Sequence, residues 1–107
     1  MSSKDPKDEK SQFKDLMDID KDIHVPARLM ILSILYVNES ADFVFLRGQT
    51  ELTWGNLSAH ITKLESKGYI TIEKEFKNKR PRTMVELTEK GKREFLAYRE
   101  KMKKMLG

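Results

Sequence analysis

The chain has 107 residues, a formal net charge of +4 and no cysteine. This length fits a single domain, and the lack of cysteine excludes disulfides, zinc–thiolate sites and thiol sensing. No apolar run approaches the length of a membrane span, so we expect no membrane partner and, by default, a soluble cytoplasmic protein.

The charge is unevenly placed along the chain. Residues 1–24 hold 5 Lys against 7 acidic residues, and the rest of the chain holds 16 Lys and Arg against 10 acidic residues. A basic domain behind an acidic leader suits a polyanion partner. Charge taken alone, however, favours a simpler interpretation, in which Lys and Glu side chains only keep the surface soluble.

The N-terminal region divides into a tail and a short apolar pattern. Residues 1–12 are mainly Ser, Lys, Asp and Glu, so we expect a disordered polar tail ahead of a domain formed by residues 13–107. The apolar residues that follow fit one helical stripe: Phe13, Leu16, Met17 and Ile23. This spacing predicts a short amphipathic helix over residues 13–23.

Three aspartates alternate within that segment: Asp18, Asp20 and Asp22. Their spacing is that of a calcium-binding loop, but the glycine and the final glutamate of such a loop are replaced by Ile23 and Leu29. We therefore interpret the three acids as a solvated helix surface.

Two further helices are expected before residue 52. Residues 26–38 (PARLMILSILYVN) begin with proline and are apolar nearly all the way round, which predicts a central helix partly covered by a second subunit. Asp42 can then cap a short helix. The apolar side of that helix would be formed by Phe43, Phe45 and Leu46.

Residues 53–67 (TWGNLSAHITKLESK) carry signals for both ends of a helix. Thr53 is a good N-terminal cap, and Gly68 fits the left-handed position after the last turn. The apolar residues fall on one face: Leu57, Ile61 and Leu64. A short turn over residues 50–52 joins this helix to the preceding one, so the pair forms a helix-turn-helix.

The opposite face of this helix is small, polar and almost free of acidic residues. With the capping Thr53 it supplies the predicted DNA contacts: Gly55, Asn56, Ser58, Ala59, Thr62 and Lys63. Such a face suits the major groove of double-stranded DNA. The Asn56 amide matches an adenine edge, although the residue can equally belong to the N-terminal cap. The hydroxyls of Ser58 and Thr62 suit phosphate or base contact better than mere solvent exposure.

After Gly68 the pattern changes to that of two strands, over residues 69–76 and 83–87. Between them lies a basic loop, KNKRPR, which proline stiffens. It contributes four cations and no acid: Lys77, Lys79, Arg80 and Arg82. We expect this tip to contact a DNA backbone or minor groove rather than to be a merely solvated turn. The predicted fold is mainly α with a small β-hairpin wing (α+β), a winged helix-turn-helix.

The last segment predicts a long helix capped by Thr88, with a heptad-like apolar seam that begins at Gly91. A small domain cannot fully bury such a seam, so we expect a homodimer rather than a monomer whose seam folds back on its own core. The predicted interface residues come from this seam and from the N-terminal stripe: Phe13, Leu16, Met17, Phe95, Tyr98, Met102 and Met105.

Three motifs occur in order: LTWGNLSAHITKLESKGYI, then RPRT, then LTEKG. Together they resemble the winged-helix transcriptional regulators related to the MarR and ArsR groups of bacteria and archaea, over residues 24–106. The resemblance implies a dimeric repressor or activator, with helix 53–67 in the major groove and the wing over residues 77–82 on the backbone or minor groove. The chain departs from the family pattern at Glu51, where glycine is usual in the turn.

Other functions fit the sequence less well. No nucleophile–base–acid set, Gly-rich phosphate loop or metal-ligand cluster is apparent, so we expect neither an enzyme nor a cofactor nor a metal site. Trp54 and His60 lie beside the apolar face. We interpret Trp54 as a packing residue and His60 as a hydrogen-bonded structural residue rather than a ligand. The alternative is a winged-helix adaptor for proteins of a transcription or replication complex. A small-molecule effector is an open question, because no polar cluster defines its pocket.

Overall fold

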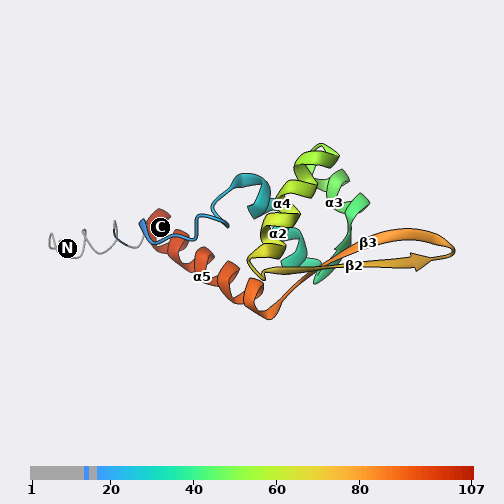
Figure 1. Ribbon diagram of the computed structural model, residues 1–107. Coiled ribbons are helices and arrows are strands. Elements are labelled where there is room, and N and C mark those ends of the chain that lie inside the picture. The colour runs from blue at the N-terminus through green and yellow to red at the C-terminus, as the bar shows by residue number, and fades with distance from the viewer. Residues whose placement is uncertain (1–13, 15–16) are drawn as a thin grey trace, which may run out of the picture.

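The computed structural model describes residue 14 and residues 17–107. Its elements are α2 (Pro26–Asn38), β1 (Ser40–Asp42), α3 (Phe43–Thr50), α4 (Trp54–Ser66), β2 (Ile70–Lys77), β3 (Arg80–Leu87) and α5 (Glu89–Leu106). The predicted tail and the side chains of Phe13 and Leu16 lie outside the described residues. The predicted fold class is confirmed: helices surround one end of a small sheet, and the β2–β3 hairpin extends away from them (Figure 1).

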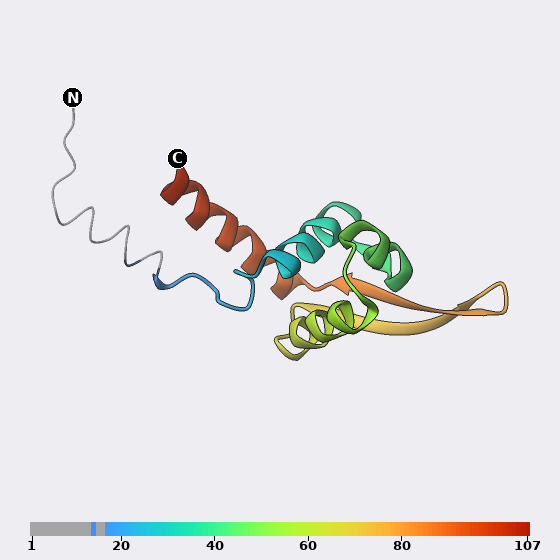
Figure 2. The same cartoon turned by 90° about the horizontal axis from the view of Figure 1, so that it is seen from above.

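The core is centred on α2, which begins and ends as the sequence predicts. Most of the fully buried side chains come from α2, α4 and the sheet: Ile31, Leu32, Leu35, Leu57, Ile61, Leu64, Ile70 and Val85. In α4 the predicted apolar face is the buried one. Seen from above, α5 leaves the base of the hairpin and runs away from it, opposite to the direction of the hairpin tip (Figure 2).

The sheet has three strands in the order β1–β3–β2, all antiparallel. The sequence analysis did not predict β1, because three residues, Ser-Ala-Asp, have no strand pattern of their own and are held by pairing with β3. Ala41 lies opposite Val85 and is buried. Asp42 ends this strand and caps α3, where its carboxylate accepts a hydrogen bond from the Phe45 backbone N–H at 2.6 Å.

The buried side of α3 differs from the prediction. Leu46 is buried as expected, but its companion is Thr50, and Phe45 is 45% exposed. The Thr50 hydroxyl donates to the Leu46 carbonyl oxygen at 2.8 Å, so its burial leaves no hydroxyl unpaired. Glu51 then adopts a left-handed conformation, with φ of 59°, which glycine adopts more readily than other residues.

The predicted helix over residues 13–23 does not continue through its second half, because residues 18–25 form turns. The interpretation of the aspartates as a solvated surface is wrong for Asp20 and for Asp22, whose carboxylate forms ion pairs with three cations. Asp20 accepts hydrogen bonds from the backbone N–H groups of Asp22 and Ile23 and from the Tyr69 hydroxyl. These bonds fold the segment onto the domain, with Ile19 and Ile23 buried.

The hairpin is longer than predicted, since residues 77 and 80–82 belong to strands rather than to a loop. Only Asn78 and Lys79 form the turn, both left-handed with φ of 53° and 63°, the conformation of a two-residue type I′ turn. Such a turn makes Lys77 and Arg80 a hydrogen-bonded pair, so the nitrogen of Pro81 points away from β2. Proline is tolerated there because no ladder bond is lost.

Two glycines allow the junction between α4, β2 and α5. Gly68 has φ of 77°, as its predicted position after α4 requires. Gly91 lies against the Tyr69 carbonyl oxygen, which a Cβ at this position would approach to 2.1 Å. Thr88 caps α5 as predicted and accepts a hydrogen bond from the Gly91 N–H at 2.9 Å.

Candidate nucleic-acid interface

The outward face of α4 is organised by its N-terminal cap. The Thr53 hydroxyl accepts a hydrogen bond from the Asn56 backbone N–H at 3.1 Å, which fixes where the first turn begins. With Leu57, Ile61 and Leu64 buried, the helix exposes the face that the sequence singled out: Gly55, Asn56, Ser58, Ala59, Thr62 and Lys63. Among the described residues the cap engages only the backbone of Asn56. The side-chain amide of Asn56 takes no part in the cap and lies on the surface.

The cation on this face is not independent of the rest of the chain. Lys63 lies 3.9 Å from the Asp22 carboxylate, which also contacts Lys67 at 3.2 Å and Arg28 at 3.6 Å. One carboxylate from the N-terminal segment thus compensates the cations at the C-terminal end of α4. The predicted contact by Lys63 would have to compete with this ion pair.

The hairpin tip has a different electrostatic character. Lys77, Lys79 and Arg80 are exposed, and in the described part of the chain they have no ion-pair partner. Arg82 is separate from them, because its Nε donates to the Glu75 carboxylate across the two strands at 2.7 Å. Three of the four predicted wing cations therefore form an uncompensated cluster, and the fourth ties the strands together.

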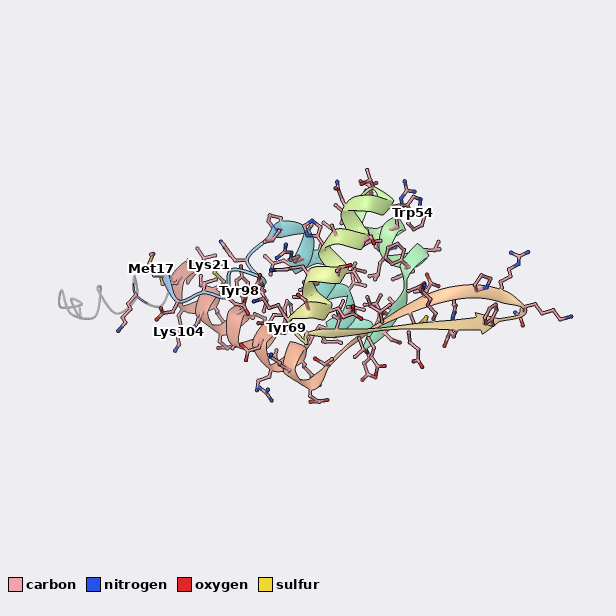
Figure 3. The ribbon with its side chains drawn as sticks, in the orientation of Figure 1. Met17, Lys21, Trp54, Tyr69, Tyr98 and Lys104 are labelled. Atoms are coloured by element: carbon pink, nitrogen blue, oxygen red, sulfur yellow. The ribbon has the colours of Figure 1, made fainter. Side chains whose placement is uncertain are left out.

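The start of α4 is braced by Trp54 and by Arg47, of which the sequence analysis did not single out Arg47. Trp54, 48% exposed, stacks on Phe43 with ring centroids 5.7 Å apart. The Arg47 guanidinium lies 5.1 Å from the centroid of the Trp54 ring, and its Nε donates to the Leu52 carbonyl oxygen at 3.2 Å. Figure 3 shows Trp54 at the end of α4 beside α3. Arg47 was missed because it lies in the preceding helix, and only the folded turn brings it to α4.

Residues 27–106 match the family model described as a winged helix DNA-binding domain. The chain belongs to this family. In this winged-helix fold, α3 and α4 form the helix-turn-helix, and the β2–β3 hairpin is the wing. The resemblance to winged helix-turn-helix transcriptional regulators that the sequence predicts is confirmed.

Two further comparisons support this membership. The winged-helix chain is 37% identical over 71 residues to an uncharacterized protein of Methanocaldococcus jannaschii, across 66% of this chain and 77% of that protein. It is also similar to a transcriptional regulator homologue from Pyrococcus horikoshii OT3, with 33% identity, a TM-score of 0.82, and coverage of 87% of this chain and 94% of that one.

A second solved structure shows the fold alone, at 18% identity. It is AbfR bound to DNA, with a TM-score of 0.70 and coverage of 87% of this chain and 65% of that one. The same arrangement of helices and hairpin is therefore found in a protein whose structure includes DNA.

Behind α4 lies a polar network that holds this helix to the N-terminal segment. The Arg28 Nε donates a hydrogen bond to Nδ1 of His60 at 3.1 Å. The Asp22 carboxylate forms ion pairs with Arg28, Lys63 and Lys67. Burial, and then the positive charge of Arg28, lower the pKa of His60 below its usual value. His60 therefore lies in a hydrogen-bonded structural position, as the sequence predicts. Among the described residues no group of three or more His, Asp or Glu side chains could hold a metal ion.

The seam of α5 is partly used within the chain. Phe95 is buried with its ring 5.6 Å from that of Tyr36, and the Tyr98 hydroxyl lies 2.7 Å from Nδ1 of His24. Burial raises the pKa of Tyr98. Toward the C-terminus, Met102 and Met105 are half-buried, and Met17 on the neighbouring segment is 75% exposed. Figure 3 shows Met17 and Tyr98 where this segment runs beside α5.

In the part of the chain that the structure describes, no helix combines the length and the apolar character needed to cross a bilayer.

Proposed function

We propose that this winged-helix protein is a sequence-specific regulator of transcription that binds double-stranded DNA. The recognition helix α4 enters the major groove, and the wing lies on the neighbouring backbone or minor groove. The observation that carries the proposal is a pair of adjacent surfaces with complementary roles. The outward face of α4 is exposed, small and polar, and the wing tip adds three cations that no described acidic residue compensates. A polyanion with readable base edges fits both surfaces.

The residues divide by the contacts that their chemistry allows. The side chains of Asn56, Ser58 and Thr62 can reach base edges, because amides and hydroxyls both donate and accept hydrogen bonds. Small or capping residues at Thr53, Gly55 and Ala59 let the helix approach the backbone closely. The phosphate contacts are assigned to the cations: Lys63, Lys77, Lys79, Arg80 and Arg82. Of these, Lys63 and Arg82 also keep the ion pairs described above.

The proposal includes a homodimer formed through α5. A single recognition helix has a small footprint, and two-fold pairing places two such helices one duplex turn apart, roughly 34–36 Å. The surface for pairing is supported by the apolar C-terminal part of α5, where Leu106 is 79% exposed. Met17, Met102 and Met105 extend this surface, and Phe13 and Leu16 are proposed to join it. Phe95 and Tyr98, buried within the chain, support it from beneath. Such a regulator would act in the cytoplasm, on the nucleoid.

Selection of bound duplexes from a random pool tests the function. We expect one enriched sequence with a two-fold repeat, bound at least tenfold more tightly than a scrambled duplex at the same salt concentration, as fluorescence anisotropy would show. Equal affinity for the two duplexes would leave only non-specific binding. No salt-dependent binding to any duplex would instead favour the protein–protein adaptor.

A further inference from the structure

The wing tip carries an exposed aromatic residue that phosphate contacts do not explain. Phe76 is 78% exposed, more than any other aromatic side chain in the described part of the chain. In the register of β2 and β3 it lies directly opposite Pro81. Lys77 follows it in the chain, and Arg80 precedes its partner. An apolar pair therefore lies at the tip, next to cations.

The strand register tells which face of the wing this pair belongs to. Side chains alternate along a strand, so Phe76 and Pro81 share a face with the pair formed by Ile72 and Val85. Val85 is fully buried beneath the helices. Phe76 and Pro81 therefore lie on the helix side of the sheet, but farther out, where the hairpin extends past the helices (Figure 1).

The opposite face of the wing is polar. It carries the ion pair between Glu75 and Arg82, which links the strands without involving Phe76. On the helix side, an open recess of about 410 Å³ separates the start of α3 from the wing. Its lining combines the apolar side chains of Phe43, Val44 and Pro81 with the polar ones of Asp42, Lys74, Arg82 and Thr83. On the helix side of the hairpin the pair of Lys74 and Thr83 separates Phe76 and Pro81 from the apolar pair of Ile72 and Val85. At the tip itself the two faces differ, because Phe76 and Pro81 lie on the helix side while Lys77 and Arg80 lie on the other.

The surroundings of Phe76 decide between possible partners. Leaving a phenylalanine in water forgoes about 2 kcal/mol of burial free energy, so we expect Phe76 to be buried against a partner. The cations at Lys77, Lys79 and Arg80, with no acidic residue between them, repel basic surfaces and attract a polyanion. The minor groove of DNA offers both features at once, since phosphates line its edges and base pairs that can be unstacked form its floor.

We propose that Phe76, backed by Pro81, is a wedge that enters the minor groove beside the recognition helix and partly unstacks one base step. The inference rests on the proposed DNA-binding function and deepens it. A wedge in the minor groove kinks the duplex toward the major groove, where α4 lies, and so draws more DNA against the protein. Pyrimidine–purine steps unstack most easily. The wing therefore selects a flexible step, such as TA, by deformability and without hydrogen bonds to its bases.

The test measures DNA bending and base unstacking on the selected duplex. The ends of the duplex carry a fluorescence-transfer pair, and 2-aminopurine replaces the adenine of the TA step under the wing. The wild-type protein should shorten the end-to-end distance and raise the 2-aminopurine fluorescence. Phe76→Ala should remove both signals and roughly a tenfold preference for TA over an AA step, with the salt dependence of binding unchanged. Phe76→Leu should keep most of each effect.

Val37→Ala is the matched control, because Val37 is similarly exposed but lies on α2. The wedge is overturned if Phe76→Ala bends and unstacks the duplex as the wild type does, while DNA binding itself stands. It is also overturned if Phe76→Ala changes the sedimentation mass of the free protein, since the residue would then contact another protein chain. If the wild type binds no duplex, the proposed function fails together with the wedge.

Discussion

Two groups of cations in this molecule look alike in the sequence and differ in the fold. At the C-terminal end of α4, Lys63 and Lys67 share the Asp22 carboxylate with Arg28. At the wing tip, three cations have no acidic partner among the described residues. Counting charges would rank the two groups as equal. Pairing shows that the first group holds the N-terminal segment to the domain, whereas the second is left for a partner.

The comparison also narrows the part of α4 that can meet DNA. Asp22 lies beside the last turn of the helix, where it adds negative charge. The first turns, from Thr53 to Ala59, have no carboxylate on the outward face. The polyanion should therefore contact the N-terminal half of α4 and the wing tip most strongly, and the contacts proposed for Thr62 and Lys63, closer to Asp22, should contribute less.

The largest expected effect comes from neutralising the wing tip. The triple variant Lys77→Ala, Lys79→Ala and Arg80→Ala should lose roughly hundredfold or more of its affinity for any duplex at about 0.1 M salt, because each phosphate contact contributes through counterion release. The matched control removes three exposed cations from α5: Lys92, Arg93 and Lys103. If the control loses as much affinity in anisotropy titrations, only net charge matters and the wing has no special role.

A smaller effect is expected from the polar face of α4. Asn56→Ala should weaken binding to the selected duplex by about 1–3 kcal/mol while leaving random duplex nearly unchanged, because a base contact carries sequence information. Its backbone cap bond to Thr53 would remain in the variant. Glu65→Ala, also on α4 and exposed, is the control for helix stability. Equal losses on both duplexes would assign Asn56 to phosphate positioning.

The paired cations give a prediction of opposite sign. Asp22→Asn should release Lys63 and Lys67 and raise affinity for random duplex several-fold, with a steeper salt dependence. The cost in unfolding free energy should be small, roughly 1 kcal/mol or less, because all partners are partly exposed. Asp18→Asn, an exposed acid of the same segment, changes net charge equally. Matching gains in the two variants would show that ion pairing with Asp22 does not restrain the lysines.

The smallest effect concerns His60. Its pKa is lowered in the folded state, mainly by burial and also by Arg28, so the unfolded chain takes up the proton first as pH falls. The stability that neutral His60 contributes is therefore complete above about pH 6.5 and decreases below it. His60→Gln keeps an acceptor for Arg28 without titrating. Urea unfolding at pH 7.5 and 5.5 should show a smaller difference in this variant than in the wild type. An unchanged difference would contradict the assignment.

The parts of the fold that follow local rules could be predicted from the sequence. Both ends of α4 are marked by residues within the helix or adjacent to it, Thr53 and Gly68, and each cap forms as expected. The parts that depend on distant partners could not be predicted. Strand β1 exists because Ala41 pairs with Val85. The turns after residue 17 exist because Asp20 accepts bonds from its neighbours and from Tyr69.

The candidate site shows the same division. Periodicity places the face of α4 correctly, since one buried stripe fixes which residues point outward. It does not reveal that Lys63 and Arg82 have acidic partners, because Asp22 and Glu75 are chosen by the fold. The wing also differs from its prediction, because two left-handed residues at Asn78 and Lys79 let the strands continue almost to the tip.

The most direct test of the account maps both surfaces onto one selected duplex. Because the chain lacks cysteine, a single introduced cysteine can carry a DNA-cleaving iron chelate at one defined position. Labels at Ala59→Cys on α4 and Asn78→Cys on the wing should cut the duplex at positions about 5 base pairs apart, half a helical turn, as a major groove and its neighbouring minor groove require. A label at Lys92→Cys on α5 should cut no more than free chelate does. Cutting from α5 alone, or no cutting from either α4 or the wing, would contradict the placement of the recognition helix and the wing on DNA.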